Sequence, residues 1–417
     1  MPRQTTYLGR NQGLDLVKLI FALCVLSVLT GSIFFNLQLH QGLDAASYSH
    51  GSPTTRAAAN SALEEPICLV HAPMNINAQE KRVSDPSITI LTQQTTSICK
   101  RLHRDWSYNP PLSRYAKQIA AHQADCSKQV VFHTFDNTFG LGSHVVLWSQ
   151  AMCNAIQEGH RMRSYEPDWL WLDKEHCDPD QAKKSPLLCY FPNSEYKCGD
   201  TQEVPVANVT DPRLVKKFCN LCQNDEEKKK WRAASTEYLF ERVGPVIIQE
   251  AQRQIGLLFG AQGVPDDLIT VHIRWGDKFW EMDLAKIDEY LDAIKQLLPS
   301  DSQDTANIYL ATEDPKALDE FLKAKPSGWN VYHDITIKEL NAFRPKKGNR
   351  ASWATRNTKG RAGLVALGSM LVALEANMFV LTTKSNWSSI MNHLRTNIVD
   401  PRCGNCTKMI DLRPGFW

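Results

Sequence analysis

The second half of the chain alternates between short apolar runs and longer stretches in which apolar residues recur at helical spacing. Short apolar or β-branched runs favour buried strands, and recurrence every three to four residues favours helices. Alternation of strands and helices predicts a parallel, doubly wound sheet, so the expected fold class is α/β. We predict strands at residues 268–273, 308–311, 329–332 and 378–382, and helices at residues 286–297, 315–323 and 360–375.

The first half is less regular, but one stretch follows the same order of strand, turn and helix. Residues 130–132 form an apolar strand, Gly140 and Gly142 follow in a turn, and residues 144–156 have helical spacing. The first half therefore predicts a second α/β lobe, and we expect the binding site between the two lobes. Further helices are predicted at residues 114–123 and 237–258.

Residues 19–35 form an apolar run of 17 residues without a charge. At ~1.5 Å per residue, a helix of this length crosses a thin bilayer. Arg3, Arg10 and Lys18 precede the run against one acid, Asp15, so the N-terminus is expected in the cytoplasm and the rest in the lumen. The alternative is a cleaved signal peptide, but the run exceeds the usual core of ~7–15 residues and the cleavage site is weak. The predicted order is a cytoplasmic tail at 1–18, a transmembrane signal anchor at 19–35, a stem at 36–65, an N-terminal α/β lobe with a cysteine-rich insert at 66–266, and a Rossmann-like lobe at 267–417.

Composition excludes one class of partner and indicates a compartment. Forty-seven basic and 45 acidic residues leave a net charge of +2, so nothing indicates nucleic acid. Twelve cysteines are typical of an oxidising compartment. Cys24 lies in the anchor and Cys153 on the apolar face of a predicted helix, which leaves ten for disulfides. The C-x-x-C pairs at 219–222 and 403–406 either close small loops or share one zinc ion, and their separation of about 180 residues favours disulfides.

Polar side chains cluster directly after the predicted strand at 268–273. His272, Arg274, Asp277 and Lys278 stand at its carboxyl end, where open α/β sheets bind their ligands. An arginine in this position can hold a phosphate through two parallel hydrogen bonds. The alternative interpretation is a solvated loop after an ordinary strand.

The turn containing Gly140 and Gly142 is a second candidate for anion binding. A strand, a glycine pair and a helix N-terminus place free backbone N–H groups and the helix dipole in the same direction. The alternative is a tight turn that only docks the helix on its strand. Asp178-Pro179-Asp180 is formally a D-x-D sequence, but its proline and its cysteine-rich surroundings argue against a metal site, and we predict none.

Three separated motifs together resemble the donor-binding half of the α1,6-fucosyltransferases, which add fucose to the core of N-glycans, and their bacterial relatives that fucosylate chitin oligosaccharides. The first motif, H-x-R-x-x-D-K, is met at residues 272–278, where Trp275 replaces the family's second arginine. The others lie at residues 308–315 and 377–386, with a basic segment at 356–361 between them. The resemblance implies a two-lobed, GT-B-like glycosyltransferase whose Rossmann-like lobe binds the donor.

The resemblance also implies roles for individual residues. In the family, the arginine matching Arg274 contacts the β-phosphate, the histidine matching His272 meets the guanine, and the glycine-rich turn lies against the diphosphate. An acid after D-K is the proposed base, which makes Glu281 the nearest candidate, with Asp277 or Asp283 as alternatives, and Lys278 would link the base to the diphosphate. Further donor-side matches are Tyr290, Glu313, Asp314 and Ser385.

One departure from the family concerns guanine. The family reads guanine with an aspartate in the last helix, whereas this chain has no acid between residue 360 and Glu375, and Ser369 stands at about that position. The nucleotide preference is therefore less firmly implied than the phosphate site.

The function implied is inverting, metal-independent transfer of fucose from GDP-fucose to a glycan hydroxyl, in particular α1,6-fucosylation of an N-glycan core GlcNAc, with no cofactor. The alternatives are a fucosyltransferase for another acceptor, through protein O-fucosylation or an α1,2 linkage, and a non-catalytic lectin-like membrane protein. A short anchor fits the thinner early secretory membranes, so we expect a single-pass type II protein of the Golgi membrane. Among the sequons at Asn208, Asn386 and Asn405, we expect Asn208 to carry a glycan.

Overall fold

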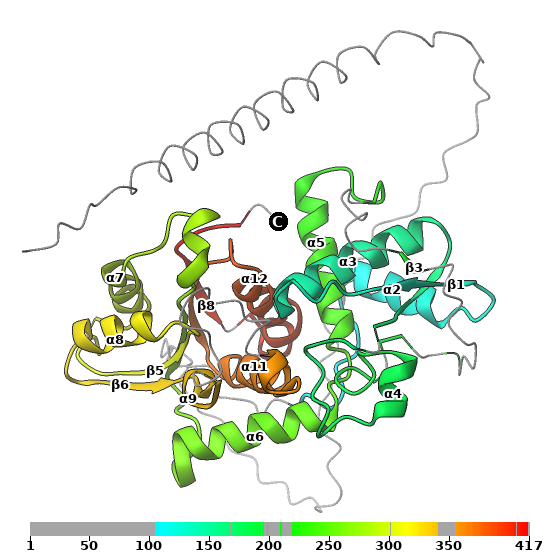
Figure 1. Cartoon of the computed structure of the whole chain (residues 1–417). Coiled ribbons are helices and arrows are strands. Elements are labelled where there is room, and N and C mark those ends of the chain that lie inside the picture. The colour runs from blue at the N-terminus through cyan, green and yellow to red at the C-terminus, as the bar shows by residue number, and fades with distance from the viewer. Residues whose placement is uncertain are drawn as a thin grey trace, which may run out of the picture. The chain divides into compact units, whose positions relative to one another are not determined.

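Five parallel strands form the larger sheet, in the order β6-β5-β4-β7-β8 (Figure 1). In this computed structural model the described residues are 105–166, 168–192, 194–195, 198, 209–210, 219–300, 302–340, 355–405 and 407–415, all within the unit Leu91–Trp417. The four predicted strands are confirmed, whereas β8 at the sheet edge was missed because it is short and half-exposed. The strands are β4 Leu268–His272, β5 Ala306–Ala311, β6 Trp329–His333, β7 Met378–Leu381 and β8 Lys408–Asp411.

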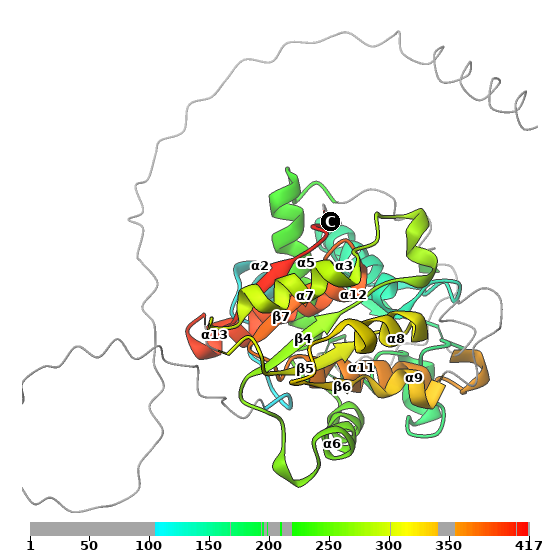
Figure 2. The same ribbon diagram turned by 90° about the vertical axis from the view of Figure 1, so that its left-hand side faces the viewer.

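Helices cover both faces of this sheet (Figures 1 and 2). The covering helices are α7 Ile287–Leu297 and α8 Pro315–Ala324 on one face, with α6 Pro245–Phe259 and α11 Arg361–Ala373 on the other. Ile269 and Val271 of β4 belong to the same buried cluster as α7 and α8. The hydroxyl of Thr270, between them, donates to the carbonyl oxygen of Ala373 in α11 at 2.6 Å. Because side chains alternate along a strand, both faces of β4 are buried, which explains its almost continuous apolar run.

A smaller parallel sheet has the order β2-β1-β3. Its central strand, β1, leads into α3, so the predicted order of strand, glycine turn and helix is confirmed, with the helix beginning before residue 144. The elements of this half are α2 Arg114–Ala124, β1 Val130–His133, α3 Leu141–Gln157, β2 Arg161–Ser164, α4 Pro179–Lys184, β3 Val209–Thr210 and α5 Asp225–Leu239. The described residues thus contain two parallel sheets with helices packed against them, which confirms the α/β fold class.

The single helix predicted at 237–258 is wrong. Helix α5 ends at Leu239, and α6 begins only at Pro245. Gly244 separates them: its N–H donates to the carbonyl oxygen of Tyr190 at 2.7 Å, and a Cβ there would lie 2.1 Å from the carbonyl oxygen of Cys189. Proline lacks the N–H that a continuing helix needs, so the Gly-Pro pair breaks the helix although the apolar spacing continues across it.

The remaining described elements are short helices and turns that connect the strands or follow β7. They are α9 Ile335–Leu340, α12 Asn386–Leu394, a π-helical turn at Arg395–Val399, α13 Asp400–Cys403, and 3₁₀ turns at Gly260–Gln262 and Gly276–Trp280. No strong local signal in the sequence marked the segment after β7, because its helix is short and interrupted.

Two of the cysteine predictions are wrong. Cys153 was set aside as an apolar helix residue, but it forms a disulfide with Cys219, with a Cα–Cα distance of 5.6 Å. The loop or zinc pair at 219–222 therefore does not exist, and Cys222 is free and buried. The side chains of the pair at 403–406 lie outside the described residues. Two further disulfides join Cys126 to Cys198 and Cys177 to Cys189.

The tail, anchor and stem predicted for residues 1–65 lie outside the described residues, as does the sequon at Asn208. In the part of the chain that the structure describes, every helix is too short or too polar to cross a bilayer.

Candidate active site

A cavity of about 350 Å³ lies where the start of α3 faces the carboxyl ends of the larger sheet. The strand order of that sheet reverses between β4 and β7, and ligands of such sheets bind at this switch point. The lining residues come from both halves of the chain. They are residues 138–143, Trp171, His272, Arg274, Lys278, Glu281, residues 311–313, Asp334, Thr336, Leu340, Ala362, Ala366 and residues 385–387.

Eight predicted site residues meet in this cavity although they are spread over almost 250 positions of the sequence. The structure therefore places the glycine turn beside the H-x-R motif, as a site between two lobes requires. The eight are Gly140, Gly142, His272, Arg274, Lys278, Glu281, Glu313 and Ser385.

Two cations of the cavity are paired with carboxylates. One guanidinium nitrogen of Arg274 lies 2.8 Å from Glu313 Oε1 and donates to the carbonyl oxygen of Trp275 at 2.9 Å. The ammonium of Lys278 forms an ion pair with Glu281, which is three residues away. Gly276 has a φ of +73°, a conformation that glycine adopts without strain, and so turns the chain between the two cations.

His272 is a neutral, hydrogen-bonded side chain at the floor of the cavity. It is 4% exposed, and its Nδ1 lies 2.6 Å from Ser388 Oγ in α12. Burial and, to a smaller extent, the positive charge of Arg274 lower the pKa of His272 to about 3. The ring therefore acts by hydrogen bonding at neutral pH and carries no charge.

Two helix N-termini face the cavity without a side-chain cap. The N-cap of α3 is Gly140, which has no side chain. The N-cap of α12 is Ser385, whose hydroxyl makes no capping hydrogen bond. Unpaired N–H groups and the helix dipole together favour an anion. The two ends are tied together, because the Asn386 amide donates to Ser143 Oγ at 3.0 Å. A Cβ on Gly142 would lie 3.3 Å from Asn386 Cβ, so glycine allows this close approach.

Asp334 is a cavity acid that the sequence analysis missed. It follows β6, and its Oδ1 accepts hydrogen bonds from the Thr336 N–H and hydroxyl, at 2.8 and 2.5 Å. The Ser369 hydroxyl lies 2.8 Å from the same oxygen, so Ser369 stands behind Asp334 and does not line the cavity. Burial raises the pKa of Asp334, and the negative charge of Glu313 raises it further. A signal existed, since Asp334 is polar and directly follows a predicted strand.

Besides Ser369, two predicted residues with described side chains, Tyr290 and Asp314, are not among those that line the cavity. Tyr290 is buried in the core beside β4, where burial raises the pKa of its phenol. Asp314 is the N-cap of α8, and its Oδ1 accepts from the N–H of Lys316 at 2.9 Å. The side chain of Asp277 lies outside the described residues. The sequence also missed Ser388, because its contact with His272 depends on long-range packing.

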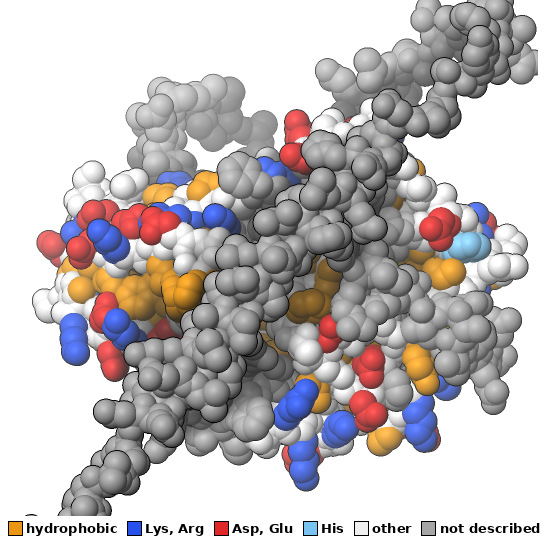
Figure 3. Space-filling view, turned by 45° about the horizontal axis from the view of Figure 1, so that its top comes forward, with side chains coloured by type: hydrophobic (Ala, Val, Ile, Leu, Met, Phe, Trp, Pro, Cys, Tyr) orange, Lys and Arg blue, Asp and Glu red, His pale blue; other side chains and the backbone are white. Residues whose placement is uncertain are grey.

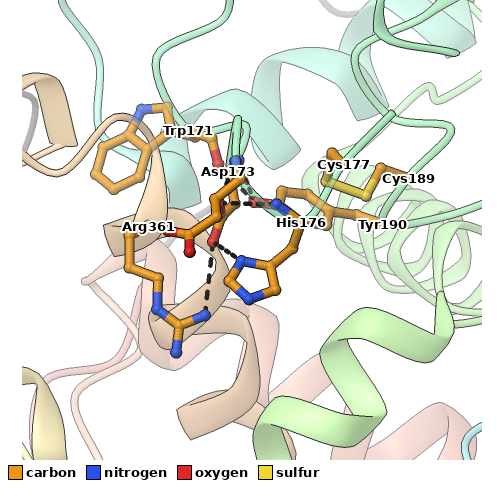
Figure 4. Close-up of a disulfide and its surroundings, with 8 residues drawn as sticks. Trp171, Asp173, His176, Cys177, Cys189, Tyr190 and Arg361 are labelled. Atoms are coloured by element: carbon orange, nitrogen blue, oxygen red, sulfur yellow. Dashed lines mark hydrogen bonds and ion pairs between the residues drawn. A yellow bond between two sulfur atoms is a disulfide. The ribbon is translucent and has the colours of Figure 1, made fainter. Parts of the chain in front are cut away.

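One wall of the cavity is held by a polar network around Asp173 (Figure 4). The indole N–H of Trp171 donates to the carbonyl oxygen of Phe139, which positions the ring in the wall. Asp173 Oδ2 lies 3.5 Å from Arg361 of α11, and Arg361 also pairs with Glu250 of α6 at 2.8 Å. The network therefore fixes a segment of the first half against two helices of the second.

A disulfide and two glycines reinforce this wall. The Cys177–Cys189 disulfide closes a loop just after the segment that includes Asp173, and Tyr190 directly follows Cys189 (Figure 4). The Tyr190 hydroxyl donates to the carbonyl oxygen of Trp171 at 2.9 Å. Cβ atoms on Gly360 and Gly363 of α11 would lie 1.7 and 2.0 Å from backbone oxygens of this segment, so only glycine permits the contact.

No family model and no curated protein matches the chain. Among solved structures, it is similar to NodZ α1,6-fucosyltransferase soaked with GDP-fucose, at 13% identity and a TM-score of 0.34, over 64% of this chain and 93% of that one. It is also similar to a mutant of FUT1 from Arabidopsis thaliana in complex with GDP, at 11% identity and a TM-score of 0.37, over 73% of this chain and 75% of that one. A third similar structure is the apo form of POFUT1, at 11% identity and a TM-score of 0.35, over 67% of this chain and 97% of that one. With TM-scores this low, the similarities carry no argument about what this chain does.

Proposed function

We propose that the protein is an inverting glycosyltransferase that moves fucose from GDP-fucose to a glycan hydroxyl without a metal ion. The proposal rests on the three sequence motifs together with the geometry of the cavity. Its finer form is α1,6-fucosylation of an N-glycan core GlcNAc by a type II protein of the Golgi membrane.

The single observation that carries the proposal is that Arg274 shares one cavity with two uncapped helix N-termini. Breaking the bond between fucose and a nucleoside diphosphate places negative charge on the β-phosphate oxygen. A guanidinium and converging N–H groups stabilise such a charge where it develops. A cavity of this composition therefore suits a diphosphate leaving group.

Donor binding would rearrange the two ion pairs. A diphosphate competes with Glu313 for Arg274 and with Glu281 for Lys278, because a phosphate group carries more charge than a carboxylate. Displacement from Lys278 frees the Glu281 carboxylate to accept the proton of the acceptor hydroxyl as that oxygen attacks C1 of fucose. Asp334 offers a buried acceptor to the N–H groups of guanine, a role for which helix α11 has no acid.

The decisive experiment measures hydrolysis of GDP-fucose by the full chain in detergent, with and without a glycan acceptor. Arg274→Ala should lower kcat/KM by at least ~100-fold, and Arg274→Lys should not restore it, because a lysine cannot make two parallel bonds. Arg413→Ala is the matched control, since it removes an ion pair with Glu289 outside the cavity lining and should retain activity.

Two outcomes would point elsewhere. Binding of GDP-fucose without turnover, unchanged by Arg274→Ala, would favour a non-catalytic lectin-like protein. Turnover with protein O-linked or α1,2 acceptors instead of an N-glycan would keep the enzyme and change its acceptor.

A further inference from the structure

Two aromatic side chains stand in solvent beside the cavity. Trp280 is 82% exposed and Phe279 is 56% exposed. Their ring centroids lie 4.4 Å apart with an interplanar angle of 39°, so they form one paired surface. Leaving an indole and a phenyl ring in water costs free energy in proportion to their apolar area, and such surfaces mark binding sites.

Their position in the chain ties this surface to the cavity. Phe279 and Trp280 lie between Lys278 and Glu281, which both line the cavity. The N–H of Glu281 donates to the carbonyl oxygen of Lys278 at 2.9 Å, and their side chains form an ion pair across the two aromatic residues. The aromatic pair therefore occupies the cavity rim next to the exposed carboxylate of Glu281.

The segment that carries the pair is held at both ends. The indole N–H of Trp275 donates to the carbonyl oxygen of Ala285 at 2.9 Å, on the far side of the pair. The N–H of Met282 donates to the carbonyl oxygen of Lys278 at 3.0 Å. An aromatic surface on an anchored turn binds with little loss of conformational entropy.

We propose that Phe279 and Trp280 form a stacking platform for a pyranose ring of the acceptor glycan. The apolar C–H face of a pyranose packs on an aromatic ring, while its hydroxyls remain at the edge for hydrogen bonding. A ring seated on Trp280 presents a hydroxyl to Glu281, which is the proton acceptor in the proposed reaction. The platform thus deepens the proposed function, on which it rests, by assigning the acceptor side of the site.

The rim position favours a glycan over other occupants. A donor fills the cavity, so the acceptor must approach from outside, past the side chains of the rim. The aromatic pair is flanked by charged groups of both signs, Lys278 and Glu281. Figure 3 shows, for one face of the molecule as a whole, that hydrophobic side chains lie between basic and acidic ones. Hydroxyl groups at a sugar edge match such mixed surroundings, whereas a lipid bilayer or a dry interface between copies does not.

The test compares Trp280→Ala with Trp280→Phe in the full chain, using chitotetraose as the acceptor probe and GDP-fucose as the donor. Trp280→Ala should raise KM for chitotetraose at least tenfold and leave acceptor-independent hydrolysis of GDP-fucose unchanged. Trp280→Phe should recover most of the affinity. Tyr108→Ala is the control for loss of an exposed aromatic side chain, since Tyr108 is 56% exposed, like Phe279, and does not line the cavity.

An unchanged KM in Trp280→Ala would overturn the proposal, as would a variant whose only defect is weaker vesicle binding or self-association. Tryptophan fluorescence with chitotetraose alone separates this failure from failure of the proposed function. If the wild type does not turn over GDP-fucose, a saturable fluorescence change that disappears in Trp280→Ala still supports the platform. Absence of that change in the wild type overturns it.

Discussion

The ion pair between Arg274 and Glu313 has two opposing effects on the cavity. Their 2.8 Å ion pair orients the guanidinium, but it also places a negative charge beside the position proposed for the diphosphate. Coulomb repulsion at such distances amounts to about 1 kcal/mol or more in a partly solvated site. Glu313 therefore orients the guanidinium of Arg274 and at the same time weakens the binding of the proposed donor.

Glu313→Gln should tighten GDP binding by roughly fivefold, because the amide keeps a hydrogen-bond acceptor for Arg274 and removes the charge. Isothermal titration with GDP measures the effect. Glu320→Gln on the surface of α8, where Glu320 pairs with Lys316, is the control. Weaker GDP binding in Glu313→Gln would mean that orientation of Arg274 outweighs the repulsion.

The sequence predicted those site residues that lie next to a local signal. Arg274 and Lys278 follow an apolar strand, so their place at a ligand edge could be inferred without the fold. Ser388 could not be found, because its contact with His272 joins positions 116 residues apart. Asp334 obeys the same strand-end rule as Arg274, so the same reasoning from sequence could have identified it.

At the scale of elements, the N-termini of α3 and α12 are the main source of partial positive charge besides the two cations. A Cβ added to Gly140 meets no atom within 4 Å, so a methyl group there extends into open space at the cavity. A Cβ on Gly142 would instead press on Asn386 and Trp387 at 3.3 Å. The two glycines therefore have different purposes, ligand approach and helix packing.

Gly140→Ala should weaken GDP binding at least tenfold while lowering Tm by only a few degrees, since loss of a glycine N-cap costs about 1 kcal/mol or less. Gly256→Ala in α6 is the control, because its Cβ also meets nothing within 4 Å and Gly256 does not line the cavity. Titration with GDP and thermal unfolding measure both effects. Unchanged GDP affinity in Gly140→Ala would exclude the α3 N-terminus from the anion site.

Elements were predicted well where apolar spacing and termini agreed. Helix α7 and strand β4 have clear periodicity and charged or polar ends, so their bounds were close. The helix predicted at 237–258 joined the last residues of α5 to α6, because apolar residues recur across Gly244 and Pro245 although the Gly-Pro pair breaks the helix. Two-residue β3 has too few residues to carry any pattern.

On the scale of the whole molecule, four buried histidines link stability to pH. Burial lowers the pKa to about 3 for His133 and His272 and to about 4 for His144 and His393. The unfolded chain has histidines with pKa near 6.5, so it binds more protons than the folded chain between these values. The stability contributed by these groups is present above pH ~6.5 and is lost as the pH falls from there towards their folded-state pKa values of about 4 and about 3.

Thermal unfolding should therefore shift to lower temperature by at least about 10 °C between pH 7 and pH 5, since each buried histidine adds up to about 1.4 kcal/mol per pH unit. His393→Gln should reduce the slope by roughly a quarter, because it removes one of the four groups. Calorimetry across this pH range measures both. A Tm independent of pH would contradict the assignment of these rings as neutral in the folded state.

The arrangement of the two halves was predicted only in outline. A site between two α/β layers followed from the order of strands and motifs, but the contacts that build it did not. The Arg361 network and the close approach of Gly360 and Gly363 to the first half depend on atoms far apart in sequence. Disulfide pairing had the same limit, which is why Cys153 was misjudged.

The hydrogen bond from Asn386 to Ser143 has a consequence for biosynthesis. Asn386-Trp387-Ser388 is a sequon, and the amide nitrogen that would carry an oligosaccharide is the atom that joins α12 to α3. A glycosylated amide keeps one N–H, but an oligosaccharide on this nitrogen would have to fit beside the 3.0 Å contact with Ser143 and within the lining of the cavity. If the protein is made in the secretory pathway, as proposed, an oligosaccharide at Asn386 would hinder the entry of a ligand into the cavity, and we expect the active form to be the one in which this asparagine is unmodified.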